Sequence, residues 1–261
     1  MYKSIVCFCV AVVFFACMSV DTSESRPVVI EEFTATWCGF CYGAGLALDQ
    51  IHEETSREEI VVIAYHINDA YDVKPFNSSR MEYYGVNGIP RVFFNGNRDR
   101  IGGSGETDGQ SGVNKLYKTY LNLISLAKID IERNDPFNLS LQGEITTKSI
   151  TMKLTLHADT SYPHSLKAIF LTTRDGIRVN APNGQSELNF VVDTYVGEEM
   201  FEVNEAGTIV FEKDKAVQLS ASWLEDVQPV VIIQDTDRKQ IVGAVGMFAA
   251  EQVSVEEWAL H

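Results

Sequence analysis

The chain has 261 residues, of which 45% are hydrophobic and 22% are charged, and its formal net charge is −15. This composition is typical of a globular protein rather than a disordered one, and the length predicts two domains. The acidic excess argues against nucleic acid as a partner, because its phosphates would be repelled. Beyond that exclusion, the charge predicts only a well-solvated surface.

The N-terminus has the pattern of an export signal. Lys3 precedes an apolar run from Ile5 to Ala16, which is too short to span a bilayer, since a spanning helix needs about 20 residues. Such a run is typical of a secretory signal peptide, and no later segment is long and apolar enough to span. We therefore expect a chain that is exported but not transmembrane.

Cys17 leaves two interpretations open. The Phe-Phe-Ala sequence before it resembles a relaxed form of the signal in which a bacterial lipoprotein is acylated on cysteine. Residues 1–17 would then be a lipoprotein signal and residues 18–26 a polar tether, which predicts an outer-membrane or periplasm-facing lipoprotein of the cell envelope. The alternative is ordinary cleavage close to Cys17, with no lipid attached.

Residues 27–129 alternate between strand and helix patterns. Residues 27–34 and 60–67 are apolar runs that predict buried strands, and a helix is expected between them, from Cys38 or Phe40 to about Ser56. Strand, helix and strand at this spacing form a βαβ unit with a parallel sheet. Asn77 is expected to cap a short helix that stops at Gly85.

The end of this region predicts a hairpin and a longer helix. Asn95-Gly96 is a strong hairpin signal between strands at residues 91–94 and 97–101. Apolar residues recur at helical spacing over residues 112–128. The region as a whole is therefore expected to be an α/β domain with a mixed sheet and flanking helices.

The pattern changes near residue 130. Asn134-Asp135-Pro136 breaks the helix, and roughly seven short apolar segments follow, several of them alternating with polar residues. These segments include AVQLSASW, PVVIIQ and QIVGAVGMF. Short strands at this density predict an all-β sandwich over residues 130–261.

Cys38 and Cys41 are the cysteines that remain after export, since Cys7 and Cys9 leave with the signal and Cys17 is lipidated or lost. A single Cys-x-x-Cys leaves redox, metal-binding and structural roles open. Placement at the start of a helix favours a thiolate at Cys38, because the helix N-terminus lowers the pKa of a thiol. We therefore predict Cys38 as the attacking thiol and Cys41, one turn later, as the resolving thiol.

The segments WCGFC and GVNGIPRVFFNG together resemble the thioredoxin-like fold. The resemblance implies a Cys38–Cys41 redox-active disulfide with no other cofactor. It also implies a cis Ile89–Pro90 loop that faces the disulfide and binds an extended substrate, and a substrate-binding role for Trp37. The dipeptide Gly39-Phe40 differs from that of the reducing and oxidising relatives, so the resemblance does not imply a redox potential.

Glu32 matches the buried acid that thioredoxins carry beneath the disulfide. A buried carboxyl has a raised pKa and can act as a general base, so Glu32 is predicted to assist proton transfer. The rival is Glu31, which strand alternation places on the opposite face. His66, in the next predicted strand, is interpreted as a satisfied, partly buried residue.

More narrowly, an exported thioredoxin-like domain followed by a β-sandwich resembles the bacterial outer-membrane-protein-28-related family. EEFTATWCGFC and GVNGIPRVFFNG carry this resemblance, with Ser222-Trp223 and Gln234-Asp235 around a buried strand in the second half. The segment LNFVVDTYVG lacks the His and Arg expected there, which puts any activity of that segment in question.

The sequence predicts no metal site. Two cysteines are too few for a structural zinc site, and no two of the five histidines stand at motif spacing. Residues 235–239, DTDRK, lack the glycine and terminal Glu of a calcium loop and are interpreted as a hairpin turn.

Two functions follow as hypotheses. The first is an exported thiol–disulfide oxidoreductase that acts on the thiols or disulfides of other exported proteins and is recycled by a reducing or oxidising partner protein. The alternative is a non-catalytic envelope or surface lipoprotein that uses the same scaffold and the β-sandwich for binding, because fold alone does not decide function.

Overall fold

The structure is a computed structural model that describes residues 26–133 and 136–247. The predicted signal peptide, Cys17 and residues 18–25 of the tether lie outside this range, so export and lipidation stay predictions. None of the described helices is both long and apolar enough to cross a membrane.

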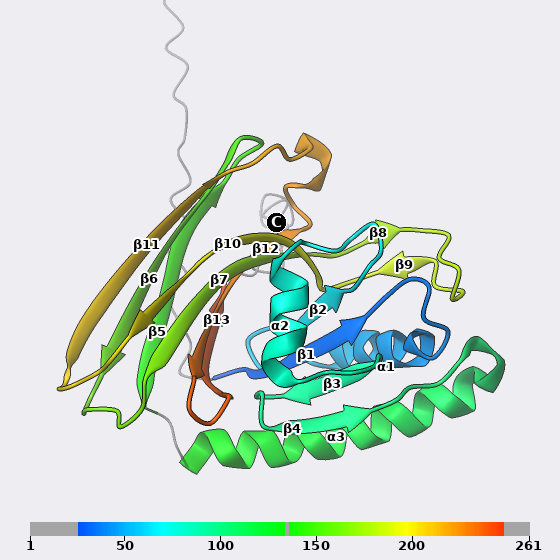
Figure 1. The fold of residues 1–261 in the computed structure, drawn as a ribbon, viewed down its shortest axis with the longest axis horizontal. Helices are drawn as coiled ribbons and strands as arrows, with labels where there is room; N and C mark the ends of the chain where they lie inside the picture. The colour runs from blue at the N-terminus through cyan, green and yellow to red at the C-terminus, as the bar shows by residue number, and fades with distance from the viewer. Residues whose placement is uncertain (1–25, 134–135, 248–261) are drawn as a thin grey trace, which may run out of the picture.

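An eight-stranded mixed sheet forms the centre of the described chain (Figure 1). Its strands are β1 (Val28–Thr34), β2 (Ile60–His66), β3 (Arg91–Phe94), β4 (Arg98–Ile101), β7 (Leu166–Arg174), β10 (Val191–Phe201), β12 (Val227–Asp235) and β13 (Gln240–Gly246). They lie in the order β13-β12-β7-β10-β2-β1-β3-β4. β2 runs parallel to both β1 and β10, and the other neighbours are antiparallel.

Three helices cover the two faces of this sheet: α1 (Cys41–Glu54), α2 (Phe76–Tyr84) and α3 (Gly109–Arg133). Alternation along β1 explains the arrangement, because successive side chains of a strand point to opposite faces. Val28 and Ile30 pack with α1 and α3, whereas Val29 and Phe33 pack on the face that α2 covers. All seven residues of β1 are buried, as expected of a central strand with both faces covered.

A second, antiparallel sheet packs against β7, β12 and β13 of the large sheet. It contains β5 (Phe137–Ile145), β6 (Ser149–Ala158) and β11 (Gly207–Ala216), in the order β11-β6-β5. Its apolar side chains share a core with Phe170 of β7 and Val231 of β12, and Figure 1 shows it as a separate layer. The described chain therefore combines a mixed sheet with few helices and an additional antiparallel sheet.

Strands from both sides of residue 130 belong to the large sheet. β10 joins β2 through the parallel pair Val191 and Ala64, and the Ala64 N–H donates to the Phe190 carbonyl at 2.8 Å. One buried core includes Ile63 of β2 together with Ile232 of β12. The sequence predicted a separate sandwich after residue 129, and this pairing was not foreseen, because a sequence pattern identifies strands but not their partners.

Local signals placed several elements well. The hairpin between β3 and β4 has Asn95 and Gly96 at φ of 48° and 73°, the conformation that this dipeptide favours. Helix α2 ends at Gly85, whose φ is 67°, as a left-handed C-cap requires. The predicted helix over residues 112–128 lies within α3.

Three local predictions were wrong. Pro75, not Asn77, caps α2, and the Asn77 side chain instead donates to the His66 carbonyl at 2.9 Å. Helix α1 begins at Cys41 rather than at Cys38 or Phe40, because residues 35–40 form a turn. AVQLSASW forms no strand beyond Ala216, and its end is the 3₁₀ turn Ala221–Trp223.

A second 3₁₀ turn, Glu106–Asp108, precedes α3.

Candidate functional site

Cys38 and Cys41 form a disulfide at the end of β1, where the chain turns into α1. Their Cα atoms are 5.3 Å apart, within the usual range for a disulfide. The Cys38 N–H donates to the Ala35 carbonyl at 3.1 Å, and the Cys41 N–H donates to the Cys38 carbonyl at 3.0 Å. Cys38 is 7% exposed and Cys41 is fully buried, so a reactant in solution meets the Cys38 sulfur first.

The loop that contains Ile89 and Pro90 lies against this disulfide. The Ile89–Pro90 peptide bond is cis, and the Ile89 carbonyl oxygen is 3.7 Å from Cys38 Sγ. With the disulfide closed this is a contact, and a reduced Cys38 thiol would be able to donate to that oxygen. The structure thus brings together Cys38, Cys41, Ile89 and Pro90, which the sequence separates by about fifty positions.

Segment 102–105 borders the disulfide loop on another side. The Ser104 N–H donates to the Phe40 carbonyl at 3.0 Å, and the Gly43 N–H donates to the Ser104 carbonyl at 2.8 Å. A Cβ at Gly103 would lie 1.9 Å from the Phe40 carbonyl oxygen, so only glycine allows this approach. The segment fixes the backbone on which Phe40 projects into solvent with 64% of its surface exposed.

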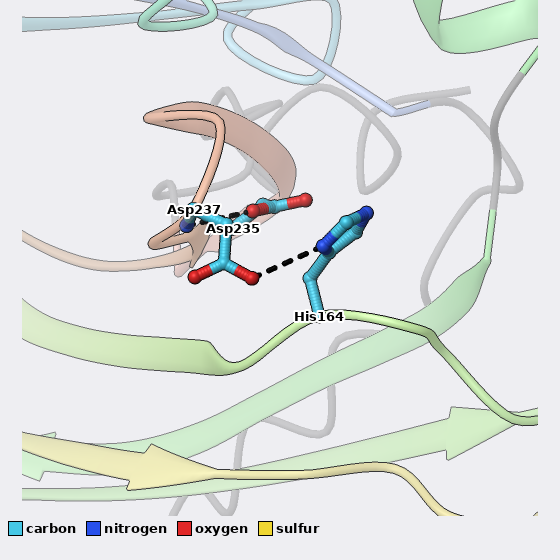
Figure 2. Close-up of side chains that lie close together, drawn as sticks. All are labelled: His164, Asp235 and Asp237. Atoms are coloured by element: carbon cyan, nitrogen blue, oxygen red, sulfur yellow. Dashed lines mark hydrogen bonds and ion pairs between the residues drawn. The ribbon is translucent and has the colours of Figure 1, made fainter.

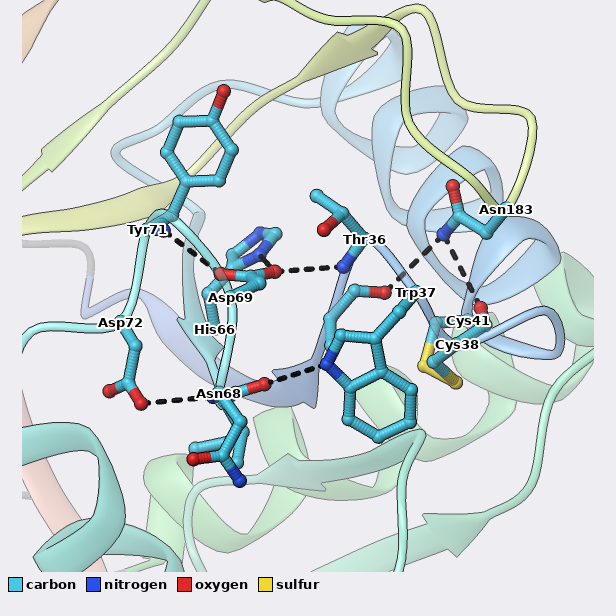
Figure 3. A network of polar contacts seen from close by, with 12 residues as sticks. Thr36, Trp37, Cys38, Cys41, His66, Asn68, Asp69, Tyr71, Asp72 and Asn183 are labelled. Atoms are coloured by element: carbon cyan, nitrogen blue, oxygen red, sulfur yellow. Dashed lines mark hydrogen bonds and ion pairs between the residues drawn. A yellow bond between two sulfur atoms is a disulfide. The ribbon is translucent and has the colours of Figure 1, made fainter.

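Trp37 is 52% exposed beside the disulfide, and its indole N–H donates to the Ile67 carbonyl at 3.2 Å. Asp69 also holds this turn, through its hydrogen bond to Thr36 (Figure 3). Its carboxylate accepts the N–H groups of Thr36 at 2.8 Å and Tyr71 at 2.9 Å, and it lies 2.7 Å from His66 Nδ1. Burial alone would raise the pKa of Asp69, but these partners outweigh it and lower that pKa. His66 is therefore a buried residue with a partner, as predicted, whereas the role of Asp69 was missed.

Glu32 and Glu31 are both buried, on opposite faces of β1. Glu32 shares a small pocket with Asp49 of α1 and His66 of β2, and among the described residues its Oε1 has no hydrogen-bond partner. Burial, reinforced by the charge of Asp49, raises the pKa of Glu32 to about 8. Burial likewise raises the pKa of Asp49 to about 6, although the Asn189 side chain donates to its carboxylate at 3.0 Å and opposes the shift.

The Glu32 carboxyl is expected to make the protein less stable as the pH rises from about 4.5 to 8. Its folded-state pKa of about 8 lies above the ordinary value of 4.5, so the folded state binds a proton that the unfolded chain has already released. The resulting stability is complete below about pH 4.5 and is lost as the pH approaches 8, at roughly 1 kcal/mol per pH unit. Urea unfolding of wild type and Glu32→Gln across this range measures the difference, and the variant should show a flatter dependence. Equal slopes of stability against pH in the two proteins would contradict the prediction. The control is Glu205→Gln, which changes an exposed carboxyl.

A hairpin from the second half of the chain covers this site. β8 (Ile177–Arg178) and β9 (Glu187–Leu188) pair in this hairpin. At its tip, the Asn183 N–H donates to the Thr36 carbonyl at 3.0 Å. The Asn183 side chain donates to the Ala35 carbonyl at 3.4 Å and to the Cys38 carbonyl at 3.3 Å.

His164, Asp235 and Asp237 form the one cluster of potential metal ligands found among the described residues (Figure 2). The Asp235 carboxylate already accepts the N–H groups of Asp237 at 3.0 Å and Arg238 at 2.9 Å, and the Tyr162 hydroxyl at 3.0 Å. These bonds build the turn between β12 and β13. Asp235 is therefore explained by the turn, and we assign no metal to the cluster.

Fold and site together define a class: a mixed-sheet protein with a Cys-x-x-Cys disulfide at the end of a central strand, attached to an antiparallel β layer. No protein-family model matches the chain, and no curated protein matches it. Among solved structures, HBP35 of Porphyromonas gingivalis matches with a TM-score of 0.62 and 17% identity, over 87% of this chain and 76% of that one. This similarity shows a shared fold.

A domain of the outer membrane lipoprotein Omp28 from Porphyromonas gingivalis also matches, with 12% identity over 43% of this chain and 87% of that one. Its TM-score is 0.31, and we draw no argument from it.

Proposed function

We propose that the protein is an exported thiol–disulfide oxidoreductase that exchanges disulfides with other envelope proteins through Cys38 and Cys41. The observation that carries this proposal is the contact between the Cys38 sulfur and the Ile89 carbonyl of the cis Ile89–Pro90 loop. An extended substrate lying along that loop would present its own sulfur to Cys38. The exposed side chains of Trp37 and Phe40 flank the same position.

The chemistry is an exchange of two electrons between sulfur atoms. In the reducing direction, the Cys38 thiolate attacks a substrate disulfide, a mixed disulfide forms, and one substrate thiolate leaves. Cys41 then loses its proton and attacks the Cys38 sulfur, which releases the second substrate thiol and closes the Cys38–Cys41 disulfide. The oxidising direction is the reverse. Glu32, with its raised pKa, is the proposed acceptor of the Cys41 proton.

The resemblance to thioredoxin-like proteins supports this function. In the described chain, α1 and α3 lie on one face of the strands β2-β1-β3-β4 and α2 lies on the other. This agrees with the mixed sheet and flanking helices that the sequence predicts for residues 27–129. The proposed location in the cell envelope, and a lipid on Cys17, rest on the N-terminal pattern and on the resemblance to the outer-membrane-protein-28-related family.

The alternative is a binding protein in which the disulfide is structural. The burial of both cysteines and the hairpin over their loop favour it, because a structural disulfide is inaccessible to reductants. In that case the antiparallel β layer would carry the binding function.

The reduction potential of the Cys38–Cys41 pair separates these two functions. Residues 18–261 retain every described residue and contain these two cysteines alone. This chain would be equilibrated in graded thiol buffers, and its free thiols counted by mass after alkylation. A potential between roughly −120 and −280 mV supports the oxidoreductase. A potential below about −300 mV with slow exchange would exclude it and favour the binding protein.

A further inference from the structure

The turn that holds Cys38 is fixed from outside by the tip of the β8–β9 hairpin. Asn183 donates hydrogen bonds to the carbonyls of three residues in that turn. Its side chain donates to Ala35 and Cys38, and its backbone N–H donates to Thr36. Figure 3 shows the Asn183 side chain directed at the disulfide loop. These carbonyls belong to residues on either side of Trp37, and one of them is that of Cys38, whose sulfur reacts in the proposed exchange.

The hairpin is built to hold Asn183 in this position. Asn183 is 5% exposed, and Gln185 at 9% exposure accepts its side-chain N–H at 2.8 Å. The Gln185 N–H in turn donates to the Asn183 side-chain oxygen at 3.1 Å. Gly184, between them, has a φ of 95°, a conformation that glycine adopts without strain. The Asn183 amide is thus oriented before it meets the disulfide loop.

Closing a disulfide orders the loop between its cysteines, and this loss of freedom opposes closure. A loop whose backbone is already held loses less freedom, so its disulfide is more stable toward reduction. Because Asn183 donates hydrogen bonds to backbone carbonyls and not to the sulfur atoms, its effect on the disulfide comes through the backbone.

We propose that Asn183 is a positioning residue of the Cys-x-x-Cys site, through which the second half of the chain sets the stability of the Cys38–Cys41 disulfide. The inference deepens the proposed function, on which its physiological meaning rests. The reduction potential then depends on both halves of the chain, since residues from each side of residue 130 hold the loop.

The test compares the redox equilibrium of Asn183→Ala with that of wild type, again using residues 18–261. In the equilibrium, two thiols of a glutathione or dithiothreitol buffer give two electrons and two protons to the disulfide and leave as the oxidised buffer. We expect the equilibrium constant for disulfide formation to fall about threefold to tenfold, which shifts the potential by about 15 to 30 mV toward easier reduction.

Two further variants keep the test decisive. Ser186→Ala changes an exposed residue of the same hairpin and should leave the potential unchanged. Gln185→Ala removes the group that orients the Asn183 amide and should shift the potential in the same direction by less; it also replaces Asn183→Ala if that variant does not fold.

The positioning role is overturned if folded Asn183→Ala has an equilibrium constant for disulfide formation within twofold of the wild-type value. An equal shift in Ser186→Ala would also overturn it. This failure differs from failure of the proposed function, which appears as a wild-type potential below about −300 mV with slow exchange. The Asn183 comparison remains measurable in that case.

Discussion

Replacing Cys41 with Ser is expected to stop the protein at the mixed disulfide and to lower its turnover by about a thousandfold or more, as loss of a covalent participant does in other enzymes. The variant retains the Cys38 thiol, which is the more exposed sulfur and lies against the Ile89 carbonyl. It can attack a substrate disulfide, but no second thiol is present to attack the Cys38 sulfur and release the substrate. The covalent complex therefore accumulates.

The measurement is capture from cells that express the tagged variant, with thiols blocked on lysis and complexes separated on a gel without reductant. Bands that disappear on reduction would be the trapped exported partners. The matched control is Cys38→Ser, which retains the fully buried Cys41 and should trap little. No reducible complexes in either variant, or equal trapping in both, would contradict the assigned roles of the two cysteines.

Replacing Glu31 with Ala is expected to cost about 3 to 5 kcal/mol of stability, because it leaves the Arg80 guanidinium buried without its counter-charge. Glu31 is fully buried and accepts the Arg80 Nε–H at 2.8 Å. Its carboxylate also accepts the hydroxyls of Tyr65 at 2.8 Å and Tyr84 at 2.5 Å. A change of this size is a large fraction of the total stability of a typical domain.

This ion pair also connects the two halves of the chain. Arg80 donates to the side chain of Gln234 in β12, and Gln234 donates to the Tyr84 hydroxyl at 2.9 Å. Urea unfolding followed by circular dichroism measures the loss, and strands on both sides of residue 130 should lose structure together. The control is Glu59→Ala, whose partner Lys128 is 43% exposed, and a surface pair of this kind contributes at most about 1 kcal/mol. A loss below that value in Glu31→Ala would contradict the prediction.

The distinction between Glu31 and Glu32 shows how far local pattern reaches. Strand alternation is enough to place two adjacent acids on opposite faces of β1, and the structure buries both of them there. It is not enough to say that one acid meets an arginine while the other keeps an oxygen without a partner among the described residues. That difference depends on α2 bringing Arg80 to one face and α1 bringing Asp49 to the other.

By itself, the sequence determined those features that depend on neighbours along the chain. The strand, turn and helix around Cys38 and Cys41, the Asn95-Gly96 hairpin and the glycine that ends α2 follow from backbone preferences of a few adjacent residues. These signals are local because a hydrogen bond within a turn or helix joins residues three or four positions apart. The contact of the Pro90 loop with the disulfide was instead implied by the resemblance that two separate motifs carry.

Only the tertiary structure decided which distant segments meet. The pairing of β10 with β2 and the contact of Asn183 with Cys38 join residues more than a hundred positions apart. Such contacts depend on which apolar faces and unpaired strand edges are left to cover once the local elements have formed. The link between Asn183 and the disulfide therefore appears only where the second half of the chain folds back on the first.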